Sequence, residues 1–131
     1  MSASRRRAVL DASAVLALLF EEPGAAAVAD VVPRATVSAV NWIEVWQRCR
    51  TVGYDPADVR DRLLGVGLEI AALSVSQAEA AAELREPTRH LGLSLADRCC
   101  LVLAIQSGLP ALTADAAWTG ADVGADVTVI R

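Results

Sequence analysis

Short apolar runs alternate with helical segments along almost the whole sequence, and this alternation limits the folds open to the chain more than any other feature. Runs typical of short buried strands lie at residues 8–10, 35–38, 68–73, 111–113 and 127–130. Helices are expected at residues 15–20, 25–32, 41–51, 57–64, 76–85 and 94–107, with a turn or short helix around 116–118. This alternation predicts an α/β fold in which helices cover both faces of a mostly parallel central sheet.

The length and the turn signals predict one compact domain. A chain of 131 residues has room for a single domain over 1–131, and no repeat or linker divides it. Gly65 and Gly67 are expected to end the helix at 57–64, and Gly108 followed by Pro110 is expected to end the helix at 94–107. Because 54% of the residues are hydrophobic but only 4% are aromatic, Ala, Val and Leu must build the core.

The charged residues exclude several classes of function. All 12 basic residues are Arg, against 16 Asp and Glu, and the net charge of -4 argues against a protein that coats nucleic acid through a general basic field. The absence of Lys excludes the phosphate-binding loop that ends in GK[ST]. It also counts against a phosphatase that uses Asp11 as a covalent nucleophile. Because His90 is the single histidine, cleavage by a histidine pair within one chain is excluded as well.

Cysteine usage and hydropathy favour the cytoplasm. The 3 cysteines fit neither a zinc nor a disulfide spacing, and we expect them to be buried hydrophobes in a reducing compartment. The arginines at 5–7 precede an apolar stretch, as in a secretion signal, but Asp11 interrupts that stretch. No apolar run reaches the roughly 18 residues of a membrane span. We therefore expect a cytoplasmic protein with no membrane segment.

Two acidic residues occupy positions where an α/β sheet commonly forms a site. Ligands of such folds gather outside the carboxyl ends of the strands. Asp11 directly follows the strand at 8–10, and Asp115 lies two residues after Thr113, which ends the strand at 111–113. Taken alone, each Asp is equally well explained as the N-cap of the helix that follows it.

Two further acids lie on expected helices. Glu44 shares one helix side with Asn41, Gln47 and Arg48, so on its own it fits a solvated polar face. Asp97 is the last residue of the capping-box pattern at 94–97 and opens a helix that is apolar nearly all round. A carboxylate in that position lies close to the core, where a buried charge requires a partner.

The four carboxylates together predict a divalent metal site. One pair of them about 4 Å apart costs about 4 kcal/mol at an effective dielectric constant of about 20, so a cluster needs a cation. Oxygen ligands without histidine or paired thiolates favour Mg²⁺ or Mn²⁺ over Zn²⁺. These ions assist phosphodiester hydrolysis. The alternative is a non-catalytic α/β protein-interaction module in which the four acids are helix caps and surface charges.

Four short segments carry these acids. They are residues 9–14, 41–45, 93–98 and 112–118, with the sequences VLDASA, NWIEV, LSLADR and LTADAAW. Each segment alone is permissive, but their order and spacing extend over nearly the whole chain. In this combination they resemble the PIN-domain ribonucleases, and specifically the VapC toxins of bacterial toxin–antitoxin pairs.

The resemblance implies a three-layer α/β/α sandwich and a VapC-like toxin that cleaves RNA phosphodiester bonds as a Mg²⁺- or Mn²⁺-dependent endoribonuclease. It implies homodimerisation and a small VapB-like antitoxin whose tail blocks the acidic pocket. It assigns the catalytic and metal-binding quartet to Asp11, Glu44, Asp97 and Asp115. It gives Ser13 and Thr113 as supporting hydroxyls. The resemblance identifies neither the RNA nor the number of metal ions.

Two more acids follow the last of these segments. Asp122 and Asp126 lie in the polar-poor stretch at 120–126. They fit either an outer shell of the acidic site or a loop that is kept soluble by its charges, and we favour the loop.

Overall fold

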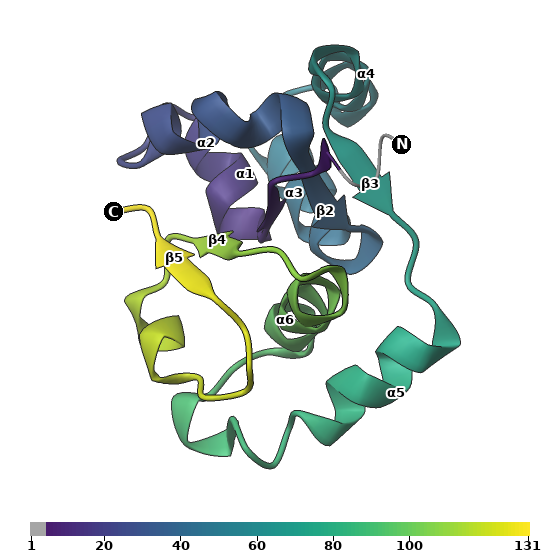
Figure 1. Cartoon of the computed structure of the whole chain (residues 1–131). Helices are drawn as coiled ribbons and strands as arrows, with labels where there is room; N and C mark the ends of the chain where they lie inside the picture. Colours follow the sequence, from purple (N-terminus) through teal and green to yellow (C-terminus); the bar gives the residue numbers. More distant parts are fainter. Residues whose placement is uncertain (1–4) are drawn as a thin grey trace.

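A five-stranded parallel sheet forms the centre of the computed structural model, which describes residues 5–131 (Figure 1). The strand order is β3-β2-β1-β4-β5, and every pairing between neighbours is parallel. The strands are β1 (Ala8–Leu10), β2 (Ala35–Ser38), β3 (Glu69–Ala71), β4 (Ala111–Thr113) and β5 (Val127–Val129). The expected α/β architecture is confirmed, and the prediction of one domain over 1–131 stays a prediction.

Helices cover both faces of the sheet (Figure 1). One face packs against α1 (Ala12–Leu19), α2 (Ala25–Val31), α3 (Ala39–Thr51) and α4 (Pro56–Val66), and the other against α6 (Leu95–Ser107), on which α5 (Val75–Glu83) lies. Short 3-10 helices lie in the connections between these elements: η2 (Val32–Arg34), η3 (Arg89–Leu91) and η4 (Ala116–Gly120). The three layers are those of an α/β/α sandwich.

The alternation of side chains along β1 separates the core into two halves. Ala8 and Leu10 pack with the helices of the first face, whereas Val9 packs with α6 and with Trp118 of η4 on the second. All three strand residues are buried, which explains why the strand reads as a continuous apolar run.

The three cysteines are free thiols buried in these layers. Cys49 of α3 lies in the core of the first face, and Cys100 of α6 lies in the core of the second. Burial raises the pKa of Cys49, and it raises the pKa of Cys100 well above the ordinary value. The thiols are therefore held in their neutral form, as small apolar side chains are.

Several helix boundaries differ from the sequence expectations, and two of the differences have a clear local cause. Helix α1 begins at Ala12, three residues earlier than expected, because the Asp11 side chain caps it. Helix α4 continues through Gly65 and ends only at Gly67, whose φ of 114° supplies the left-handed conformation that stops a helix. Gly65 was expected to stop this helix, but a glycine weakens a helix interior without ending it.

Among the described residues, no helix combines the length and the apolar character needed to cross a bilayer.

Candidate functional site

The carboxyl ends of the strands place several candidate residues at one edge of the sheet. Asp11 follows β1, and Thr113 is the last residue of β4, the strand next to it. Ser38 ends β2 on the other side of β1 and caps α3, the helix that carries Glu44. Because neighbouring parallel strands end at the same edge, residues far apart in the sequence become neighbours here.

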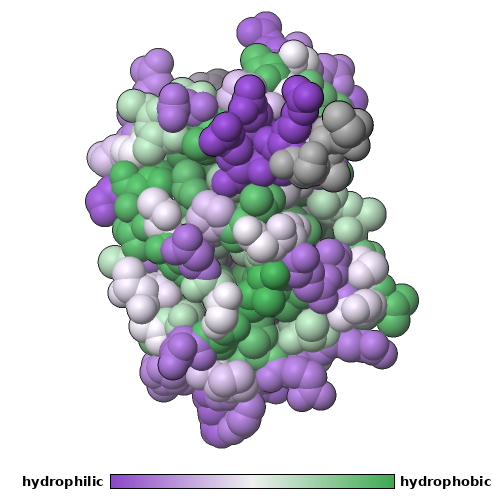
Figure 2. Space-filling view, in the orientation of Figure 1, coloured by the Kyte–Doolittle hydropathy of each residue, from purple (hydrophilic) through white to green (hydrophobic). Residues whose placement is uncertain are grey.

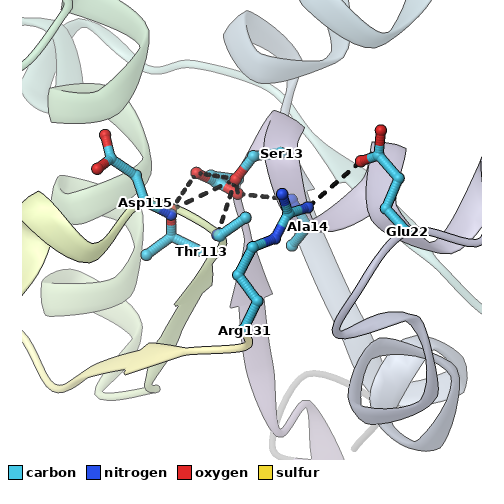
Figure 3. Close-up of polar contacts among 8 residues, drawn as sticks. Ser13, Ala14, Glu22, Thr113, Asp115 and Arg131 are labelled. Atoms are coloured by element: carbon cyan, nitrogen blue, oxygen red, sulfur yellow. Dashed lines mark hydrogen bonds and ion pairs between the residues drawn. The ribbon is translucent and has the colours of Figure 1, made fainter.

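Asp11 is the centre of a hydrogen-bond network at this edge, and Figure 3 labels its partners Ser13, Ala14 and Thr113. Its carboxylate accepts from the Thr113 hydroxyl at 2.7 Å, from the Ala14 backbone N–H at 2.8 Å and from the Ser13 hydroxyl at 2.7 Å to Oδ1 and 2.9 Å to Oδ2. Only 4% of the residue is exposed, so these contacts replace the water that burial removes.

The two hydroxyls of this network have their protons directed toward Asp11. The Ser13 Oγ accepts from the backbone N–H of Ala114 at 2.9 Å, and the Thr113 Oγ1 accepts from the N–H of Asp115 at 3.0 Å. A hydroxyl has one proton, so a backbone donor on its acceptor side leaves that proton free for the carboxylate. Both hydroxyls therefore stabilise the ionised form of Asp11.

Burial nevertheless raises the pKa of Asp11 above the ordinary value of 3.8. The bonds from Thr113, Ser13 and Ala14 act in the opposite direction, and the negative charge of Asp97 adds to the increase. Asp11 thus carries a charge that the folded protein disfavours, with Asp97 near enough to contribute.

Glu44 experiences the same negative charge. Its pKa is raised by partial burial and by Asp97, and a hydrogen bond from the Asn41 side chain partly offsets the increase. Asp97 is the acid common to both effects, and it lies at the N-terminus of α6 with its side chain half-buried. The fold therefore couples Asp11, Glu44 and Asp97 through their charges.

The carboxylates of Asp97 and Asp115 accept hydrogen bonds from backbone N–H groups at the starts of two helices. Asp97 accepts from the Ser94 backbone N–H at 2.8 Å within a capping box, and Asp115 accepts from the Ala117 N–H at 2.9 Å as the N-cap of η4. Figure 3 shows the Asp115 carboxylate directed away from Ser13 and Thr113. Asp115 joins the Asp11 network only through its backbone N–H, which donates to the Thr113 hydroxyl. In these conformations, no group of three or more His, Cys, Asp or Glu side chains within residues 5–131 is arranged to hold a metal ion.

The chemistry of the donor set still fits a hard divalent cation. The candidate ligands are carboxylate oxygens, and burial raises the pKa values of Asp11 and Glu44, with the negative charge of Asp97 adding to both increases. A divalent cation would relieve that repulsion. Asp97 and Asp115 would have to exchange their bonds to backbone N–H groups for bonds to the ion.

The buried position of Asn41 on α3 differs from the sequence expectation. Asn41 was expected on the solvated side of α3, but it is 1% exposed and lies on the same side as the buried Val45. Its Nδ2 donates to the backbone oxygen of Ala96 at 3.2 Å, which ties α3 to the start of α6. The spacing of four residues to Val45 was the signal that could have shown this position to face inward.

The two acids near the C-terminus lie in exposed positions in the loop before β5. The backbone oxygen of Asp126 accepts from the N–H of Ala111 at the start of β4. Asp126 is therefore at the edge where the strands begin, opposite Asp11, as expected for a loop residue. Beyond β5, Arg131 reaches the edge at which the strands end and pairs with Glu22 at 3.3 Å (Figure 3).

Comparison with solved structures gives folds of the same kind. The chain is 22% identical to a chain of a toxin–antitoxin complex from Klebsiella pneumoniae, with a TM-score of 0.76, 95% of this chain and 98% of that chain covered. It is 16% identical to VapC20 from Mycobacterium tuberculosis, described as a sarcin-ricin loop cleaving toxin, with a TM-score of 0.71 and coverage of 91% and 98%. For DNA-bound VapBC from Salmonella typhimurium the identity is 14%, the TM-score 0.71 and the coverage 96% and 99%.

The amino-acid sequence was compared with curated proteins and with models of protein families. None of the curated proteins that were searched matches this chain. A family model described as "PIN domain" matches residues 8–123. That segment extends from β1 to the loop before β5 and contains all four candidate acids. The match covers most of the sequence, and the chain therefore belongs to the PIN domain family.

Proposed function

We propose that this chain is a VapC-like toxin, an endoribonuclease that hydrolyses RNA phosphodiester bonds with Mg²⁺ or Mn²⁺. The observation that carries the proposal is Asp11, a buried carboxylate with a raised pKa at the carboxyl edge of a PIN-domain sheet, coupled to Asp97. Acids with perturbed pKa values at such an edge are typical of sites that bind a cation or a reacting group.

In this proposal, Asp11, Glu44, Asp97 and Asp115 hold the metal. When bound, the ion supplies a water of lowered pKa and stabilises charge on the phosphate. Asp11 has the most restrained position of the four, because Ser13, Thr113 and the backbone of Ala14 fix its carboxylate. The two hydroxyls orient Asp11.

The partners follow from the related complexes. Solved structures of this fold include toxin–antitoxin complexes, and we propose a VapB-like antitoxin and a homodimer for this chain. Exposed apolar side chains beside the acidic edge offer contact area, among them Ile43 next to Glu44 and Leu95 two residues before Asp97, which are 55% and 60% exposed. An RNA-cleaving toxin of this kind acts in the cytoplasm, where its substrate is.

The test is cleavage of RNA by protein freed of any antitoxin, in the presence of Mg²⁺ or Mn²⁺. Asp97→Asn should abolish cleavage and leave a folded protein, because the side-chain oxygen of Asn can still accept the hydrogen bond from the Ser94 backbone N–H. Asp122→Asn is the matched control: it removes the same charge from an exposed loop residue and should cleave as the unmodified protein does. Cleavage that persists in excess chelator, or in Asp97→Asn, would refute the proposal.

The alternative is a non-catalytic protein-interaction module, and the capping contacts of Asp97 and Asp115 favour it. A thermal shift separates the two functions. A metal at a hundred times its dissociation constant stabilises the folded state by about 2.7 kcal/mol, whereas a module without a site shows no shift with Mn²⁺.

A further inference from the structure

Four arginines lie together at the edge where the strands begin, opposite the acidic edge. Arg5, Arg6 and Arg7 precede β1, and Arg34 directly precedes β2, the strand paired with it. The backbone N–H of Arg7 donates to the Arg34 carbonyl oxygen at 2.7 Å, which extends the strand pairing to these residues. Figure 2 shows a strongly hydrophilic patch over this part of the molecule, at the top of the view.

The four arginines line an open hollow. A cavity of about 410 Å³ is lined by Arg5, Arg6, Arg7 and Arg34, and an adjoining one of about 230 Å³ is lined by Arg5, Arg6, Arg34 and Pro33. Both are open to solvent, and apart from Pro33 the residues that line them are arginines. Such a hollow suits an anion with several oxygen atoms.

Arg6 fixes the inner part of this hollow. Its Nη1 donates to the backbone oxygens of Ala35 at 3.0 Å and Gly67 at 2.6 Å, so the side chain is half-buried and held in place. Gly67 has a φ of 114°, and a Cβ there would lie 2.5 Å from the Pro33 backbone oxygen. The backbone around the hollow is thus closely packed and leaves the other three arginines to face outward.

The positive charge in this hollow has no carboxylate partner within residues 5–131. Four other arginines form ion pairs with Asp or Glu, but Arg5, Arg6, Arg7 and Arg34 form none there. Glu69, which begins β3 at the same edge, makes no ion pair with them. Without these four arginines, the chain has 8 basic against 16 acidic residues. A concentration of unpaired cations in an acidic protein indicates a binding site for an anionic partner.

We propose that this arginine hollow binds backbone phosphates of an RNA strand, as a second contact remote from the acidic edge. The inference rests on the proposed ribonuclease function for its choice of RNA. A strand supplies several phosphates in sequence, and each guanidinium can bind one through two parallel hydrogen bonds. The four residues from Arg7 to Asp11 span about 13 Å, so one strand must pass over the outside of the molecule to reach both sites.

The test is RNA binding in chelator, where no cleavage occurs, by fluorescence anisotropy with a labelled single-stranded RNA. The variant is the triple Arg5→Gln, Arg7→Gln, Arg34→Gln, which keeps Arg6 and its backbone bonds. The control is the triple Arg60→Gln, Arg62→Gln, Arg89→Gln, which removes the same charge from arginines already paired with acids.

Loss of three phosphate contacts should reduce the slope of log affinity against log salt by about 2. Between roughly 50 and 200 mM salt, the affinity of the unmodified protein should therefore fall about fifteenfold more than that of the triple variant. The control should keep the original slope. Cleavage of a long RNA should weaken in the variant, while cleavage of a dinucleotide, which cannot reach the hollow, should not change.

Three outcomes would overturn the inference. The first is an unchanged salt slope in the triple variant, and the second is an equal change of slope in the control. The third is a loss of binding in the triple variant that is seen only with duplex DNA or a poly-glutamate peptide as the ligand and not with the RNA. A failure of the proposed function is distinguishable from these, because it abolishes metal-dependent cleavage in the unmodified protein and leaves the binding measurement in chelator intact.

Discussion

Replacing Thr113 by Val tests the Asp11 network directly. Thr113 is fully buried, and its hydroxyl both donates to Asp11 at 2.7 Å and accepts from the Asp115 N–H at 3.0 Å. Val has nearly the same shape, so the change removes these two bonds with little change in packing. A hydrogen bond to a charged group contributes about 1.5–3 kcal/mol, and the unpaired N–H adds about 1 kcal/mol.

We therefore expect Thr113→Val to lower the free energy of unfolding by about 2.5–4 kcal/mol, or the melting temperature by about 8–15 °C for a chain of this length. The loss should shrink at about pH 4, where Asp11 is increasingly protonated and its bond from Thr113 no longer involves a full charge. Denaturant unfolding at neutral and acidic pH measures both effects.

Thr36→Val is the matched control. Thr36 is a buried threonine of the same sheet, on β2, and its hydroxyl has no hydrogen-bond partner among residues 5–131. Removing an unpaired buried hydroxyl should leave stability unchanged or raise it slightly. Equal losses in the two variants, or a Thr113→Val loss that does not depend on pH, would refute the assignment of the hydroxyl protons to Asp11.

Three further expectations follow from the described contacts. Asp97→Asn should lower the pKa of Glu44, since a neighbouring negative charge is removed, and carboxyl NMR titration without metal measures it; an unchanged value would contradict the coupling. As pH falls toward 3.8, the free energy of unfolding of the metal-free protein should rise relative to that of Asp11→Asn. The reason is that the raised pKa of Asp11 favours proton uptake by the folded state. Curves of stability against pH that stay parallel for the two proteins would exclude this. Gly53 and Gly67 both have a positive φ, so Ala should cost about 1 kcal/mol of backbone strain at either position. Gly67→Ala should lose more stability than Gly53→Ala, because of these two only Gly67 would bring its Cβ against backbone atoms; denaturant melts compare the two, and equal losses would contradict this.

The fold was largely predictable because local signals agree with the tertiary arrangement. The strands at 8–10, 35–38 and 111–113 match β1, β2 and β4 residue for residue, since each is a buried run bounded by polar or turn residues. The helix ends were less predictable. Gly65 resembles a stop signal, but the left-handed conformation is needed only at Gly67, where the chain must turn past Pro33.

The sequence predicted which residues form the candidate site better than it predicted how their side chains are oriented. The position of Asp11 after β1 follows from the strand itself, and its contact with Thr113 follows from the pairing of β1 with β4. No sequence pattern shows that the Asp97 and Asp115 carboxylates turn to backbone N–H groups, because a cap and a ligand use the same side chain. The inward position of Asn41 also depends on α6, which lies more than fifty residues away in the sequence.

The placement of the free thiols provides a built-in reporter of local opening. Cys49 and Cys100 lie in different layers, on opposite faces of the sheet, and reagents in solution cannot reach either while both layers are closed. The rate at which each thiol reacts with an alkylating reagent therefore measures how often its own layer separates from the sheet. Peptide mapping of the modified residues would show whether RNA or an antitoxin restrains one half of the molecule more than the other, with no label added to the chain.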